Sequence, residues 1–252
     1  EGTPWGRFQE GHILSMNGER HKRIRDLLAP AFTPRQANLH RPLMREVIDK
    51  VLDEWAPKGE FDFEEFASDF PVTVMFRLIG AAPADLPSIR THLETMGLSV
   101  SMDPTILDQL QGAVVGMDEF VQDLMARRRR EGPQQTDNPD LLDILLNGLE
   151  GGTLTERELA DLLLMLFVAG FDTSKNVMTL MMYELLKRPD YYERCAGDFD
   201  FCKRVLEETM RVHSVTTTNR TLTADIVYRD VLLPRGTSVW FPWSVIARDP
   251  ES

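Results

Sequence analysis

The sequence has few cysteines, no apolar run long enough to span a membrane, and no excess of basic residues. Its two cysteines, Cys195 and Cys202, are too few for a disulfide framework or a zinc ribbon. The most apolar stretch, 159–171, contains Asp161 and is shorter than the roughly 20 residues that cross a bilayer. With 28 basic and 40 acidic residues the net charge is −12. This argues against nucleic acid as a general partner, because phosphate binding needs a basic surface.

The start of the chain has no basic segment followed by an apolar one, so no secretory signal is visible. It also has no initiator Met, and residues 1–5 are typical of the middle of a protein. The 252 residues suffice for one sizeable core, or for a large piece of a bigger domain. The longest basic run, 127–130, is interpreted as the solvated end of a helix, with partner docking as the alternative.

Helical periodicity dominates most of the chain. It predicts helices over about 43–52, 61–78, 110–130 and 141–149, with a break or kink at Pro71 in the second and a loop at 131–139. A capping box, Thr155 followed three residues later by Glu158, predicts the start of a much longer helix over about 156–187. At 1.5 Å per residue it is about 48 Å long. Because its middle is apolar nearly all round, we expect it to run through the centre of a domain.

The pattern changes beyond residue 200. A helix is predicted over about 201–212, followed by a β segment over about 220–245. Within it, 221–227 and 237–243 have strand character, and 233–236 (Leu-Pro-Arg-Gly) is turn chemistry. The predicted fold class is mainly α with a small antiparallel β part, in one domain.

The unusual place in the long helix is Ala169-Gly170-Phe171-Asp172-Thr173. Gly inside a helix costs about 1 kcal/mol relative to Ala, and Asp and Thr put polar groups into a buried stretch. The small residues remove bulk from one turn, and the Thr hydroxyl can reach into the opened groove. This would suit a flat ligand lying against the helix with a hydroxyl and a carboxyl nearby. An ordinary helix kink with a capped polar pair explains these five residues equally well.

Three further sets of residues are candidates. His21 and Arg25 are four apart, so they share a helix face and could bind carboxylates or phosphate. A solvated basic helix is the more common explanation of that pattern. Glu208 and Arg211 are three apart and can pair, although exposed pairs of this kind are common and contribute little. Arg220 lies between a polar run and a strand, where a lone Arg is normally on the surface.

Taken in order, these motifs closely resemble those of the cytochrome P-450 family, and most of all its soluble bacterial branch. The family has an early helix with His-x-x-x-Arg and Ala-Phe-Thr-Pro, a long central helix with Ala/Gly-Gly-x-Asp/Glu-Thr, a Glu-x-x-Arg helix, an Arg, a strand pair around Leu-Pro-x-Gly, and Asn-Arg-Asp-Pro. The matching segments here are 21–34, 169–173, 208–211, Arg220, 233–236 and 247–250. The resemblance covers nearly the whole chain.

The resemblance implies a role for each matching residue. His21, Arg25 and Arg220 would bind the propionates of haem b (iron protoporphyrin IX), and Ala169 and Gly170 would let the porphyrin approach the helix. Asp172 and Thr173 would deliver protons to dioxygen. Glu208 and Arg211 would be structural. The candidates for substrate contact are Phe167, Val215, Thr216 and Thr217.

Two departures from the family pattern matter. Ala247 stands where the family has Asn before Arg-Asp-Pro, which affects a local turn. The family's iron-ligand cysteine follows that motif in a Phe-x-x-Gly loop, whereas Cys195 and Cys202 both precede Glu208 and lack such a loop. Thiolate ligation favours O–O cleavage, so we expect an internal piece of a P-450 domain, incomplete at both ends, without metal ligands of its own.

The resemblance implies a haem-dependent monooxygenase that oxidises an apolar small molecule. It would use dioxygen and electrons from NAD(P)H, delivered by a ferredoxin- or flavin-type donor. A cytoplasmic monomer is expected, with no membrane span and no nucleic acid, and the 252 residues alone are expected to be inactive. One alternative is a non-catalytic helical protein that binds a small molecule or haem on the same scaffold. A peroxide-using variant is disfavoured because Asp172 and Thr173 are both present.

Overall fold

The computed structural model describes residues 2–101, 103–134 and 139–250. It divides into two compact units, unit 1 (Glu1–Asp172) and unit 2 (Thr173–Ser252). The boundary falls inside a long helix, α9 (Glu156–Leu186), which contributes to both. The prediction of a single domain over 1–252 stays a prediction. Within the described residues, no helix is both long and apolar enough to cross a membrane.

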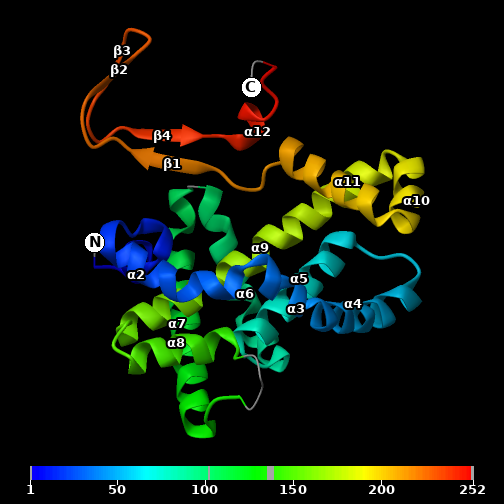
Figure 1. The fold of residues 1–252 in the computed structure, drawn as a ribbon, viewed down its shortest axis with the longest axis horizontal. Helices are drawn as coiled ribbons and strands as arrows, with labels where there is room; N and C mark the ends of the chain where they lie inside the picture. Colours follow the sequence, from blue (N-terminus) through cyan, green and yellow to red (C-terminus); the bar gives the residue numbers. More distant parts are fainter. Residues whose placement is uncertain (1, 102, 135–138, 251–252) are drawn as a thin grey trace. The chain divides into compact units, whose positions relative to one another are not determined.

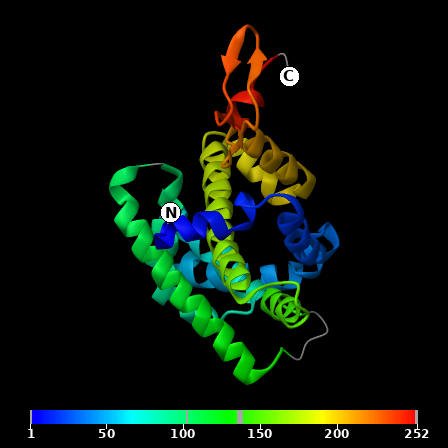
Figure 2. The same ribbon diagram turned by 90° about the vertical axis from the view of Figure 1, so that its left-hand side faces the viewer.

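Unit 1 is helical throughout its described part (Figure 1). Its helices before α9 are α1 (Pro4–Gly11), α2 (Gly18–Leu28), α3 (Pro34–Leu39), α4 (Arg41–Trp55), α5 (Phe63–Ile79), α6 (Leu86–Gly97), α7 (Leu107–Glu131) and α8 (Leu141–Glu150). Short 3₁₀ turns join several of them: η1 (Ile13–Ser15), η2 (Ala29–Phe32), η3 (Ala56–Lys58), η4 (Pro83–Asp85), η5 (Leu98–Ser101) and η6 (Pro104–Ile106). Figure 2 shows α7 as a long straight helix along one side of this unit.

The core of unit 1 gathers apolar side chains from α2 and from α5 through the first half of α9. Ile24, Phe76, Met117 and Leu163 are fully buried in it. The predicted central helix is confirmed, since α9 has 31 residues and begins within the predicted capping box. The backbone N–H of Glu158 donates to Thr155 Oγ1 (3.2 Å), and Thr155 N–H donates to Glu158 Oε2 (3.0 Å). These bonds satisfy backbone donors that a helix start otherwise leaves unpaired.

Pro71 does not break its helix, so a break at this residue is excluded and a kink stays a prediction. The structure has one continuous helix, α5, with Pro71 inside it. A proline in a helix interior costs about 3 kcal/mol. Here Pro71 is itself buried and is followed by the buried Val72 and Phe76, so core packing offsets that cost. The start of the helix is also capped, because the Asp62 side chain accepts a hydrogen bond from Glu64 N–H (2.7 Å).

The prediction that residues 127–130 form a solvated helix end is wrong for Arg128. Its side chain is 7% exposed and pairs with Asp140 (2.8 Å) and Asp143 (2.5 Å) at the start of α8. The same guanidinium donates to the backbone oxygen of Gly80, just after α5 (3.0 Å). Four residues of the predicted loop, 135–138, lie outside the described residues.

Unit 2 begins with the second part of α9 and continues through α10 (Pro189–Gly197) and α11 (Phe199–Val212). Four short strands follow: β1 (Thr218–Thr221), β2 (Ile226–Tyr228), β3 (Val231–Leu233) and β4 (Ser238–Phe241). The last helix is α12 (Trp243–Ile246). β1 pairs with β4, and β2 with β3, both antiparallel. In Figure 1 the β2–β3 hairpin extends beyond the β1–β4 pair.

The small antiparallel β part is confirmed, but its strand bounds differ from those predicted. The expected strand 221–227 is instead the end of β1 and the start of β2, and β3 was not predicted. The β2–β3 turn has positive φ at Arg229 (47°) and Asp230 (63°). Hairpin turns of this kind usually carry Asn or Gly at those positions, so residues 229–230 do not indicate a turn.

Candidate functional site

Helix α2 carries five basic residues between positions 20 and 25, and three of them are paired with carboxylates. Arg20 and Arg23 both bind Glu158 of α9 (3.0 and 2.8 Å), and Lys22 binds Asp26 one turn on (2.6 Å). Within the described residues, no such partner is found for the remaining two, His21 and Arg25, which are the two predicted from the sequence to bind an anion.

The position of the His21–Arg25 face follows from how α2 packs. Ile24 and Leu28 are buried in the core of unit 1. His21 is half-buried at the edge of this apolar stripe, and Arg25 is exposed. Residues four apart in a helix are neighbours on its surface. The two basic side chains therefore present donors side by side with no carboxylate of the described chain paired to them, as binding of an anionic ligand requires.

In the middle of α9, the space beside Gly170 is used by another helix. A methyl group on Gly170 would overlap the side chain of Met75 on α5. The missing side chain therefore allows close packing between α9 and α5. This gives Gly170 a structural explanation. The predicted contacts of Ala169 and Gly170 with a porphyrin stay predictions.

Asp172 and Thr173 follow Gly170 in the same helix, and both are half-buried. A side chain at Gly97, the last residue of α6, would come within 3.5 Å of the Asp172 carboxyl carbon. Asp172 thus lies against the end of α6 within unit 1. Thr173 is the first residue of unit 2.

Phe167 belongs to the core of unit 1. It is 1% exposed and makes edge contacts with Phe76 (ring centroids 5.1 Å apart) and Phe120 (5.5 Å). Aromatic rings in this arrangement stabilise a core beyond their buried area. Phe167 thus has a structural role in the core, and its contact with a substrate stays a prediction.

The Glu208–Arg211 pair is present in α11 and is part of a larger network in unit 2. Arg211 donates to both carboxylate oxygens of Glu208 (2.6 and 2.7 Å) and lowers the pKa of that carboxyl through these bonds. Arg211 also donates to the backbone oxygen of Ala247 (2.5 Å), and Arg248 donates to that of Val212 (2.6 Å). The two arginines thus join α11 to the segment after α12, a connection that the sequence did not reveal.

Arg220 and the segment before it are exposed parts of unit 2. Arg220 lies in β1 opposite Val239, and its side chain donates to the backbone oxygen of Asn219 (2.7 Å). Thr216 and Thr217 are exposed, and Val215 is half-buried. It stays a prediction that Arg220 binds the same ligand as His21 and Arg25. Substrate contact at 215–217 also stays a prediction.

The comparisons with known proteins agree with this arrangement of motifs. The sequence model of the family described as Cytochrome P450 matches residues 90–252, more than half of the chain. The chain belongs to the cytochrome P450 family. Haem b is the prosthetic group of this family.

Several curated P450 proteins align with almost the whole chain. A luteothin monooxygenase of Streptomyces thioluteus is 28% identical over 99% of this chain and 62% of its own length. Cytochrome P450 107B1 of Saccharopolyspora erythraea is 31% identical over 95% of this chain and 58% of its own length. The chain therefore spans about six tenths of the length of these relatives.

The solved structures give the same P450 fold. The structure of P450BioI in complex with an acyl carrier protein ligated to hexadec-9Z-enoic acid is 25% identical, with a TM-score of 0.89. It is matched over 98% of this chain and 64% of that one. CalO2, at 23% identity and a TM-score of 0.86, supports the fold alone. The mainly α fold with a small β part is thereby confirmed.

The described residues of this P450 chain fit a haem in one respect that the structure itself shows. A porphyrin brings two carboxylates, which need cationic donors where they are held. Of the basic residues on α2, the two that the family pattern assigns to the propionates are the two left without a carboxylate partner in the described chain. Cys195 and Cys202, on α10 and α11, are free thiols that precede Glu208.

Proposed function

We propose that the protein containing this chain is a haem-dependent monooxygenase that oxidises an apolar small molecule. Membership of the P450 family supports the proposal, as do relatives that are named monooxygenases, among them PikC of Streptomyces venezuelae. The observation that carries it in the structure is the unneutralised His21–Arg25 face on a helix whose other cations are all paired.

In this proposal, residues of the chain bind haem b and transfer protons near it. Bound haem b supplies the iron at which dioxygen is activated. His21 and Arg25, with Arg220, bind its propionates through charge-assisted hydrogen bonds. Thr173 holds a proton at its hydroxyl, and Asp172 relays protons to it from solvent through its carboxylate. Glu208 and Arg211 support the fold.

Electrons from NAD(P)H reach this protein through a ferredoxin- or flavin-type donor, and the protein works as a cytoplasmic monomer. The substrate is apolar, and the relatives differ in what their names say they act on. One is a steroid C26-monooxygenase and another is the biotin biosynthesis P450. We therefore propose no narrower substrate class.

The test is the reduced CO-difference spectrum of the full-length protein. We expect the red-shifted Soret band of a thiolate-ligated haem, because thiolate ligation defines this chemistry. Full-length protein that binds no haem, or binds it without that band, would overturn the proposal. An Arg25→Ala variant should keep the band but lose haem faster, since one propionate donor is gone. The exposed Arg45 on α4 provides the control, as Arg45→Ala changes the charge equally.

A further inference from the structure

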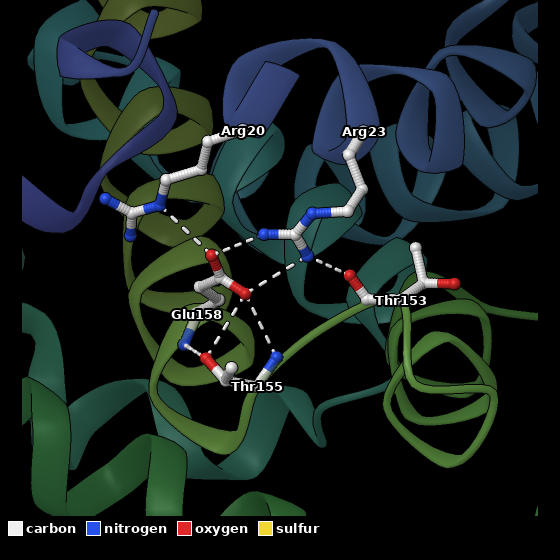
Figure 3. A network of polar contacts seen from close by, with 5 residues as sticks. All are labelled: Arg20, Arg23, Thr153, Thr155 and Glu158. Atoms are coloured by element: carbon white, nitrogen blue, oxygen red, sulfur yellow. Dashed lines mark hydrogen bonds and ion pairs between the residues drawn. The ribbon is translucent and has the colours of Figure 1, made fainter. Parts of the chain in front are cut away.

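Glu158 accepts hydrogen bonds from three other residues at the start of α9 (Figure 3). Arg20 Nε (3.0 Å) and one Arg23 nitrogen (2.8 Å) donate to Oε1, while the other Arg23 nitrogen (3.2 Å) and Thr155 donate to Oε2. Arg23 also donates to the backbone oxygen of Thr153. We call these five residues the Glu158 cluster. The Glu158 side chain is 8% exposed, whereas the side chains of Arg20 and Arg23 are 45% and 38% exposed. The buried carboxylate therefore anchors the two more exposed arginines.

Capping of α9 does not account for the arginines. A capping box needs only the reciprocal bonds between Thr155 and Glu158, and a glutamine serves in it as well as a glutamate. The bonds to Arg20 and Arg23 are additional, and they join α9 to α2, more than 130 residues earlier in the chain. The cluster therefore also links α9 to α2, and this link needs the negative charge of Glu158.

The bonds from Glu158 to Arg20 and Arg23 can set the rotation of α2 about its axis, because the His21–Arg25 face lies on the other side of this helix. At about 100° per residue, the Arg20–Arg23 face and the His21–Arg25 face are centred about 150° apart around the helix. The buried Ile24 lies between them. Apolar burial is non-directional, so the core alone leaves α2 free to rotate or slide slightly. Charge-assisted bonds have defined geometry, and they fix the rotation of the helix from one side of the apolar stripe.

We propose that Glu158 is a positioning residue for the haem propionates, which acts through Arg20 and Arg23 by holding α2 in the rotation that presents His21 and Arg25. This inference rests on the proposed function. Because Glu158 also caps α9, a single carboxylate sets the position of the propionate donors relative to the helix that carries Ala169 and Gly170. Along α9, Ala169 lies about 16 Å from Glu158.

The charge state of Glu158 suits a permanent connection. Burial disfavours its charged form, but the hydrogen bonds from Arg23, Thr155 N–H and Arg20 outweigh burial and lower its pKa to about 2. The carboxylate thus stays ionised at any pH at which the protein would work. The connection is a fixed one and not a pH switch.

The test uses full-length, haem-loaded protein and measures how fast haem transfers to excess apomyoglobin. Glu158→Gln keeps the capping box and removes the charge that both arginines need. We expect haem loss to accelerate about tenfold, the lower end of what losing an orienting partner behind a ligand costs. The thiolate-type CO band should remain, because the iron ligand is untouched.

Two controls separate positioning from general stability. Glu156 lies in the same turn of α9 and pairs with Arg129 of α7 (2.8 Å), so Glu156→Gln removes a carboxylate without affecting α2. Thr155→Val weakens the cap and leaves the arginine bonds in place. Glu156→Gln should lose haem within about twofold of the wild-type rate, as for a surface substitution. Thr155→Val should also stay within about twofold, because Arg20 and Arg23 still hold Glu158. This should hold for Thr155→Val even if it lowers Tm.

The decisive comparison repeats Glu158→Gln in an Arg25→Ala background. If Glu158 acts by presenting His21 and Arg25, its effect on haem loss is smaller in this background, because only His21 is left to be positioned and coupled residues are not additive. The same acceleration in both backgrounds, or none in either, overturns the inference while the CO band upholds the proposed function. If Glu158→Gln does not fold, Arg20→Met with Arg23→Met tests the same link with the cap intact. Wild-type protein without bound haem overturns both proposals.

Discussion

The guanidinium of Arg128 joins three helices at a buried point. It pairs with Asp140 and Asp143 at the start of α8 and donates to Gly80 after α5, from its own place near the end of α7. Gly80 has a φ of +97°, and a side chain there would overlap Asp140 and Arg128. Glycine at this position therefore serves both the left-handed helix end and the close approach of the ion cluster.

Replacing Arg128 should be costly. Arg128→Met leaves Asp140 and Asp143 buried without their cation, and breaking a buried pair from one side costs about 3–5 kcal/mol. We expect a fall of that size in the free energy of unfolding, measured by urea denaturation followed by circular dichroism. Arg130→Met, on the exposed side of the same helix end, should change stability by less than about 0.5 kcal/mol. Equal effects of the two substitutions would show that the buried cluster contributes nothing.

At the scale of elements, α9 contacts several helices of unit 1 through small or polar residues. Glu158 binds α2, Arg157 pairs with Asp118 of α7 (2.9 Å), and Gly170 admits Met75 of α5. The first two contacts use adjacent residues in the first turn of α9, and the third lies about three turns further along the helix. The buried leucines between Glu158 and Gly170 explain why this part of the helix is apolar.

The contact between Gly170 and Met75 predicts a specific rescue. Gly170→Leu should lower the free energy of unfolding by about 1–3 kcal/mol, because extra bulk in a packed contact forces neighbours apart. Met75→Ala opens that space, so the double variant should be more stable than the sum of the two single effects by at least about 0.5 kcal/mol. Urea titrations of the four proteins measure this. Strict additivity would mean that Gly170 does not serve the packing of α9 on α5.

At the scale of the whole molecule, the sequence predicted features that depend on neighbours along the chain. The capping box and long apolar run gave α9 within a residue at each end, and the Glu208–Arg211 pair follows from helix spacing alone. The features that it missed depend on partners far away. Arg128 looked solvated because Asp140 and Asp143 lie beyond a loop, and Glu158 was identified as a cap without its arginines. The ring contacts of Phe167 were not predicted either, because its two aromatic neighbours come from α5 and α7.

The last prediction concerns the iron ligand, because neither cysteine of the chain stands in the family's position for it. The 252 residues contain the His21–Arg25 face and the Asp172–Thr173 pair, but both cysteines precede Glu208, unlike the family's iron ligand. The chain expressed alone and supplied with haem should therefore give a reduced CO complex without the thiolate-type Soret band, and no substrate oxidation. Full-length protein under the same conditions is the control. A thiolate-type band that disappears in Cys195→Ser or Cys202→Ser would contradict this, because it would show that one of these thiols binds the iron.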